Sequence, residues 1–216
     1  EKLDKEIIAH PLFKDPYKIV DLPALHKGEK KIIMSLLVDY WEGAYYLADI
    51  ALMKWSYLTI IDYSLRYGNS GESAFGYVLY GANLVSKNSY KKGFIFGDIA
   101  LKINALFKDK AILPKIHNFV ANFINPYTRS LASNKLLYKK SLYQSKINGD
   151  IIFGTWANFL MHFSDYLSGN DLPDLQKNIS NESDFILASG DTKMIAIFNI
   201  LRETVNGLQG ISTRYN

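Results

Sequence analysis

The sequence has no cysteine, few prolines and no long apolar run. Without cysteine the chain cannot form a disulfide, a thiol nucleophile or a thiolate-ligated zinc site. Only six prolines occur in 216 residues, so long helices can run uninterrupted. No apolar run reaches the roughly 18 residues of a membrane-spanning helix, and we therefore predict no membrane span.

Motifs that carry chemistry are also missing. The sequence contains no G-x-x-x-x-G-K-[ST] phosphate loop and no G-x-S-x-G nucleophile motif, and its four histidines lie far apart. The carboxylate pairs Asp171 with Asp174 and Glu182 with Asp184 fit helix starts, where the helix dipole stabilises negative charge. We therefore predict that this segment is not an enzyme, with no catalytic residue, no metal site and no cofactor.

The charge is mildly positive and dispersed. The formal net charge is +4 and the isoelectric point is about 9.0. Lysines alternate with aspartates and glutamates along the chain, whereas a nucleic-acid interface needs basic residues gathered on one face. We therefore expect no nucleic-acid partner.

The apolar residues that are present recur with a helical period nearly everywhere. Asp21 fits a helix N-cap with Pro23 in the first turn, and an apolar stripe follows at Ile32, Ile33, Leu36 and Leu37. Further helices are expected at 2–9, from about 44 to 67, and at 71–86, 91–107, 111–124, 128–147, 151–168, 172–188 and 192–207. Short turns rich in Asn, Gly and Asp separate them. The pattern predicts an all-α fold of stacked antiparallel helical hairpins, forming one domain over 1–216. The sequence lacks an initiating Met, so we expect it to be a fragment of a larger chain.

The stretch 77–103 has the spacing of a tetratricopeptide unit. Gly81, Gly93 and Ala100 stand where that unit has small residues, and Tyr90 stands where it has an aromatic residue after its turn. Small side chains let two helices cross closely, while aromatic side chains fill the space beside them. Similar corners at 147–154 and 188–196 precede further helices, but at unequal intervals. We therefore predict a degenerate tetratricopeptide-like superhelix.

The corner "GNSG" at 68–71 joins two of the expected helices. Gly68 fits the residue that ends one helix, and Ser70 fits the N-cap of the next. A helix start can also bind anions, but Glu72 follows here and the lysine of a phosphate loop is absent. We favour the capping interpretation.

The segment 64–103 resembles the tetratricopeptide-like helices of very large bacterial signalling proteins. In these proteins a serine/threonine-kinase-like domain and an AAA-type ATPase precede such helices, and a histidine kinase or another output domain follows. The matching residues are Ser64, Leu65, Tyr67, Gly68, Asn69, Ser70, Ser73, Ala74, Tyr77, Tyr80, Gly81, Tyr90, Gly93, Phe94, Phe96, Gly97, Ala100 and Leu101. The resemblance implies a cytoplasmic interaction and relay module, whose partner is a protein, a peptide or an adjacent domain of the same chain.

Aromatic residues are abundant between Tyr40 and Tyr80. Some of them must belong to the core, and the remainder could line a groove for a partner helix or peptide. The candidate groove residues are Tyr45, Trp55, Tyr63, Tyr67, Asn69, Tyr77 and Tyr80. A small-molecule sensor with an aromatic-lined apolar pocket is the alternative.

Overall fold

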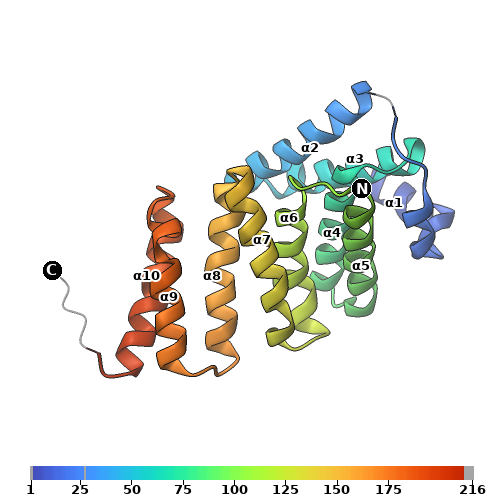
Figure 1. Cartoon of the computed structure of the whole chain (residues 1–216). Helices are drawn as coiled ribbons and strands as arrows, with labels where there is room; N and C mark the ends of the chain where they lie inside the picture. The colour runs from blue at the N-terminus through green and yellow to red at the C-terminus, as the bar shows by residue number, and fades with distance from the viewer. Residues whose placement is uncertain (1, 27, 212–216) are drawn as a thin grey trace. The chain divides into compact units, whose positions relative to one another are not determined.

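The computed structural model describes residues 2–26 and 28–211, and it is all-α (Figure 1). Its contacts divide the chain into two compact units, Glu1–Thr128 and Arg129–Asn216. The single domain expected over 1–216 stays a prediction.

Helices of the first unit pair in sequence order. Helices α2 and α3 form one hairpin, α4 and α5 form another, and α1 packs on α3. The α-helices are α1 (Lys2–Ala9), α2 (Gly28–Tyr46), α3 (Ile50–Tyr67), α4 (Gly71–Ser86), α5 (Tyr90–Phe107) and α6 (Leu113–Phe119). Short 3₁₀ turns cover Pro11–Phe13, Pro16–Asp21 and Asn125–Tyr127, and a π-helical turn covers Val120–Ile124.

The second unit repeats the hairpin arrangement. Helix α7 (Lys135–Asn148) pairs with α8 (Ile151–Leu167), and α9 (Leu172–Leu187) pairs with α10 (Thr192–Leu208). A 3₁₀ turn at Leu131–Asn134 leads into α7. Helix α8 also packs on α9, so the two hairpins are stacked. The hairpin fold expected from the sequence is confirmed.

The same turn geometry closes all four hairpins. A residue with positive φ is followed at once by the N-cap of the second helix. The pairs are Ala48–Asp49, Asn88–Ser89, Gly149–Asp150 and Gly190–Asp191. The three aspartates each accept a hydrogen bond from a backbone N–H in the first turn, at 2.9 to 3.0 Å. Such caps satisfy backbone groups that the helix leaves free.

Four expectations for local structure were wrong. The α-helix expected at 128–147 begins only at Lys135, after the 3₁₀ turn at Leu131–Asn134. The helix expected from about 44 to 67 is broken at Leu47–Asp49, where Ala48 has φ 54°. Pro23 does not start a helix, because the next residue, Ala24, pairs in an extended conformation with Asn69. The pair Glu182 and Asp184 lies inside α9, where Lys146 Nζ contacts the Glu182 carboxylate at 3.0 Å. Asp171 does cap the start of α9, as predicted.

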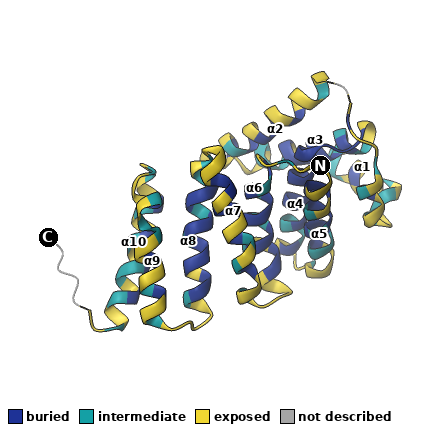
Figure 2. Cartoon of the chain, in the orientation of Figure 1, coloured by how far each residue is buried: buried dark blue, intermediate teal, exposed yellow. Residues whose placement is uncertain are grey.

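Helix α4 forms the centre of the first unit. It is buried over most of its length (Figure 2), because α2, α3, α5 and α6 all pack against it. On one side Phe75 meets the Trp41 ring edge-on at 5.3 Å, and on the other Tyr80 meets the Phe96 ring at 4.7 Å. These aromatic pairs add to the stabilisation that burial of their area provides.

Candidate interaction surface

Small residues let α4 and α5 approach closely, as the repeat spacing predicts. A Cβ atom at Gly81 would lie 2.9 Å from the Gly93 carbonyl oxygen, and one at Gly93 would lie 2.8 Å from the Gly81 carbonyl oxygen. Both glycines and Ala100 are buried. Gly97 faces the Ile124 side chain, where a Cβ would lie 2.9 Å from Cδ1. These positions therefore form helix packing and leave no room for a ligand.

Tyr90, the aromatic residue after the α4–α5 turn, is on the surface. It is 38% exposed and its ring stacks on Tyr127 at 5.2 Å, while its hydroxyl donates to the Asn88 side chain at 2.7 Å. It therefore fixes the turn from outside instead of filling the space between the helices.

The corner after α3 holds an extended segment from earlier in the chain. The Asn69 N–H donates to the Pro23 carbonyl at 2.7 Å, and the Leu25 N–H donates to the Asn69 carbonyl at 2.7 Å. The Asn69 side-chain amide donates to the Ile19 carbonyl at 2.7 Å. Gly68 has φ 102°, and a Cβ there would overlap the Pro23 carbonyl oxygen. The corner therefore joins residues 19–25 to the helices, which explains why it needs both glycine and asparagine.

The first turn of α4 is filled by groups of the chain itself. The Ser70 N–H donates to Ser73 Oγ at 2.9 Å, and the Asp109 carboxylate lies against Gly71. The other oxygen of that carboxylate accepts from the backbone N–H of Ile112 at 3.1 Å. This arrangement supports the capping interpretation of the "GNSG" corner over the anion-binding one.

Three of the predicted groove residues lie in the core. Asn69 and Tyr77 are fully buried, and Tyr80 is 5% exposed. Burial raises the pKa of Tyr80 to about 12 and raises the pKa of Tyr77 as well. Tyr77 and Tyr80 cannot line an exposed groove, because α4 is covered on the sides that carry them. Asn69 cannot line one either, because its side chain donates to the Ile19 carbonyl inside the corner.

The other four predicted groove residues reach the surface. Trp55 is 50% exposed, Tyr45 and Tyr67 are exposed to a smaller extent, and Tyr63 is half-buried. Lys30 Nζ lies 3.3 Å from the centroid of the Tyr67 ring, a cation–π contact that joins α2 to α3. Tyr63 and Tyr67 therefore support the α2–α3 hairpin through Lys30. Tyr45 stacks on Trp41 within α2, near the turn of the hairpin, whereas Tyr67 ends α3, so the four residues are not gathered at one place.

Helix α2 has an exposed apolar face that the groove prediction did not include. Ile32, Leu36 and Tyr40 are 61%, 57% and 58% exposed, and their spacing of four residues places them in one row. We call this row the α2 stripe. The opposite face of the helix is buried through Met34, Leu37, Val38, Trp41 and Ala44. The apolar pattern at 32–37 could have indicated such a helix, because it continues around more than one face.

Polar residues border the α2 stripe on one side. Lys31, Ser35 and Asp39 are all exposed there. An apolar row with a polar edge is the pattern that a helical partner recognises through its own apolar row.

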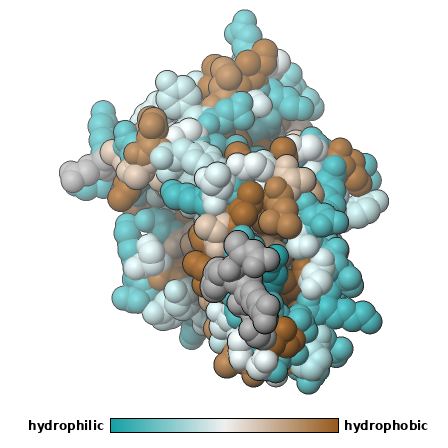
Figure 3. Space-filling model, turned by 90° about the vertical axis from the view of Figure 1, so that its left-hand side faces the viewer, coloured by the Kyte–Doolittle hydropathy of each residue, from teal (hydrophilic) through white to brown (hydrophobic). Residues whose placement is uncertain are grey.

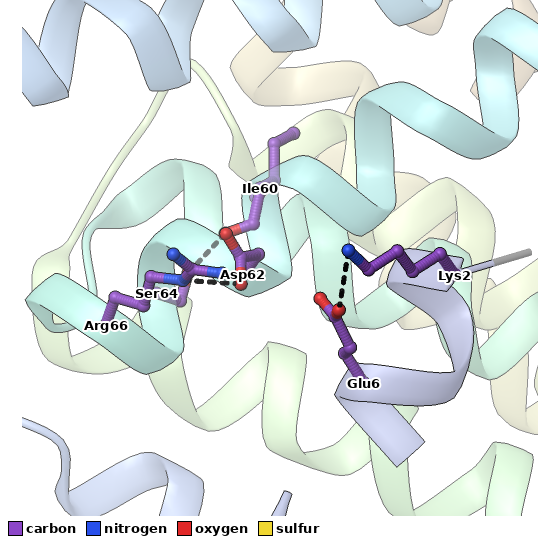
Figure 4. A network of polar contacts seen from close by, with 6 residues as sticks. All are labelled: Lys2, Glu6, Ile60, Asp62, Ser64 and Arg66. Carbon is purple, nitrogen blue, oxygen red and sulfur yellow. Dashed lines mark hydrogen bonds and ion pairs between the residues drawn. The ribbon is translucent and has the colours of Figure 1, made fainter. Parts of the chain in front are cut away.

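Helices α1 and α3 each contain polar side-chain contacts (Figure 4). Lys2 Nζ pairs with Glu6 at 3.8 Å, and Arg66 Nε donates to the Asp62 carboxylate at 2.8 Å, each within one helix. An ion pair also joins α1 to α3, with Lys54 Nζ 2.6 Å from the Asp4 carboxylate. It is partly buried, so it fixes the position of α1 more firmly than the exposed pairs do.

The second unit contains a row of buried polar side chains on α8. Asn158 and His162 are 0% and 1% exposed, and neither ring nitrogen of His162 has a hydrogen-bond partner among residues 2–26 and 28–211. Burial lowers the pKa of His162 to about 4, against the opposing effect of Asp165 and Glu182. His162 is therefore neutral at pH 7.

A cavity of about 230 Å³ lies near the end of this row. Its walls are mainly polar: Lys135, Asp165, Asn170, Asp171, Asp174, Leu175 and Asn178. Lys135 Nζ donates to the buried Asp165 carboxylate at 2.7 Å, which neutralises that charge. This cavity is not the aromatic-lined apolar pocket that a sensor for an apolar ligand requires.

The part of the chain that the structure describes contains no candidate metal site and no candidate membrane span. Within these residues there is no group of His, Cys, Asp and Glu that could hold a metal ion. Over the same ranges, no helix has the length and apolar character needed to cross a membrane. Comparison with protein-family models, curated proteins and solved structures gives no match to this chain.

Proposed function

We propose that this chain is a non-catalytic interaction module that binds an amphipathic helix of a protein partner on the α2 stripe. Leu36 stands at the centre of the site, with Ile32 and Tyr40 one turn to either side. The observation that carries the proposal is this row of three large apolar side chains, each more than half exposed, on a helix whose other face is anchored in the core. Exposed apolar patches of this kind are typical of interaction surfaces.

The chemistry of the stripe defines the partner. A helix with apolar residues at i, i+4 and i+8 can place them between Ile32, Leu36 and Tyr40. The charged border at Lys31 and Asp39 then selects complementary polar groups on the edge of the partner helix. Such a contact is small, so we expect micromolar affinity, as in transient signalling contacts.

The resemblance of 64–103 to helical segments of bacterial signalling proteins gives the proposal its context. In such a chain the partner would be a neighbouring domain or a protein that the ATPase and kinase parts control. The module would then relay a signal by holding its partner in place, and the chemistry would be performed elsewhere.

A peptide selection tests the proposal. A phage-displayed library of helix-forming peptides is selected on the wild-type chain, and the recovered peptides are then measured against two variants. Leu36→Arg removes the centre of the stripe, whereas Leu106→Arg changes a similarly exposed leucine on α5. We expect amphipathic peptides whose affinity falls about tenfold or more with Leu36→Arg and is unchanged with Leu106→Arg. Peptides that bind Leu36→Arg as tightly as the wild type would refute the proposed site.

A further inference from the structure

The outward face of α10 is apolar and exposed. Figure 3 views the chain from the side of α9 and α10, and apolar side chains are visible among the polar ones. Ile197, Ile200 and Leu208 are 42%, 67% and 59% exposed. From residue 196 onward, the other exposed residues of this face are Ala196, Thr204 and Gly207, and none of these six is charged; the exposed Lys193 lies on the same face one turn earlier. We call these six residues the α10 face.

The corresponding face of α8 shows what kind of element packs on such a surface. Asp150 and Asp191 cap α8 and α10 in the same way, so residues 41 apart correspond between the two helices. In this register Phe159 corresponds to Ile200. Phe159 packs against the buried cluster that α9 and α10 form. Helices therefore cover this face in the first of these hairpins, whereas none of residues 2–26 and 28–211 buries the corresponding Ile200 in the next.

The order of residues along the α10 face allows it to pack against the same face of a second copy related by a two-fold axis. Two antiparallel copies of α10 can be related by a two-fold axis that passes beside residue 202. Ile200 of one copy then lies level with Thr204 of the other copy. Ile197 meets the partner's Leu208 along one edge, and Ala196 meets the partner's Gly207 along the other. Small residues on that second edge let the two backbones approach closely. A two-fold interface needs this kind of self-complementary surface.

Charge does not oppose the pairing. Glu203 borders the face, but its carboxylate lies 3.4 Å from the Arg202 guanidinium and one of its oxygens is buried. Lys193 stands at the start of the helix, so a two-fold separates the two copies of this residue to opposite ends of the contact. The α10 face can therefore meet a second α10 face without bringing unpaired like charges together.

We propose that a second copy of this chain occupies the α10 face, through antiparallel packing of the two α10 helices. A single pair of helices buries less area than a standard protein interface, so we expect a dimer with micromolar affinity. This contact uses a different surface from the α2 stripe, and the two proposals can fail independently.

Sedimentation equilibrium over a range of protein concentrations tests the self-association. The wild type should shift from monomer to dimer as the concentration rises. Ile200→Arg should weaken the dimer about thirtyfold or more, because it puts a charge at the centre of the contact. Leu136→Arg, at a leucine of α7 with 61% exposure, is the matched control and should leave the dimer unchanged. Circular dichroism confirms that both variants are folded.

Disulfide trapping tests the antiparallel geometry, since the wild-type chain has no cysteine. Ile200→Cys and Thr204→Cys variants are mixed and oxidised gently. The antiparallel register predicts that the mixed disulfide forms faster than either homodimer, because Ile200 lies level with the partner's Thr204.

Three results would overturn the proposal. One is a wild type that stays monomeric at all concentrations, and another is a dimer that Leu36→Arg abolishes and Ile200→Arg does not. The third is faster trapping of the Ile200→Cys homodimer, as a parallel pairing would give.

Discussion

Replacing Gly93 by alanine tests the close crossing of α4 and α5. The new Cβ would lie 2.5 Å from Val85 Cγ2 and 2.8 Å from the Gly81 carbonyl oxygen. The valine methyl can rotate away, but the carbonyl belongs to a helix and cannot. Because the Gly81 carbonyl is fixed, the overpacking cost lies in the upper part of the usual range, about 2–3 kcal/mol, whereas the better helix propensity of alanine returns about 1 kcal/mol. We therefore expect Gly93→Ala to lower the free energy of unfolding by about 1–2 kcal/mol.

Gly43→Ala is the matched control. Gly43 also lies inside a helix, α2, but a Cβ atom added there would have no heavy atom within 4 Å beyond its own helix backbone and chain neighbours. Here only the propensity gain applies, so the variant should be more stable than the wild type by up to about 1 kcal/mol. Both substitutions replace glycine by alanine, but they should change the free energy of unfolding in opposite directions.

Urea unfolding followed by tryptophan fluorescence measures both effects. Of the three tryptophans, Trp41 and Trp55 belong to the first unit, so a Trp156→Phe background restricts the signal to that unit. A Gly93→Ala variant as stable as its parent, or more stable, would refute the close crossing.

Three further predictions concern other parts of the chain. Gly68→Ala should destabilise the first unit by about 2–4 kcal/mol, because it combines a positive φ with overlap on the Pro23 carbonyl; an unchanged urea midpoint would contradict this. Asn69→Ala should lower the free energy of unfolding of the first unit by about 1–3 kcal/mol, because it removes the donor to the buried Ile19 carbonyl. Amide hydrogen exchange near residue 25 should then accelerate. Between pH 6.5 and about 4, His162 is protonated in the unfolded chain but stays neutral in the folded chain. The free energy of unfolding of the second unit should therefore fall by up to about 3 kcal/mol as the pH falls through this range. His162→Leu should make this fall smaller, and an equal dependence on pH in the variant and the wild type would contradict the prediction.

Local sequence rules predicted the hairpins and the close crossing well. Gly149 and Gly190 each precede an aspartate, and this pattern identifies a helix end followed by a helix start. The break at Ala48 was missed because alanine seldom adopts a positive φ, and only Asp49 marked the start of α3. Periodicity alone could not separate the two helices there.

The candidate site was harder to predict, because exposure depends on contacts between distant residues. Tyr77 and Tyr80 carry no local signal that the Phe96 ring of α5 and the Phe13 ring of the first 3₁₀ turn would pack over them. The pairing of Pro23 with Asn69 also joins residues far apart in sequence, and no repeat or motif indicates it. Ile32, Leu36 and Tyr40 were visible as apolar residues, but only the packed helices show which face of α2 remains open.

Hydrogen exchange of the chain with and without a selected peptide tests the proposed function most directly. If the α2 stripe is the binding site, amides of α2 (Gly28–Tyr46) should exchange more slowly when the peptide is bound, while α5 and α8 keep their rates. Protection that appears on other helices and leaves α2 unchanged would contradict the account.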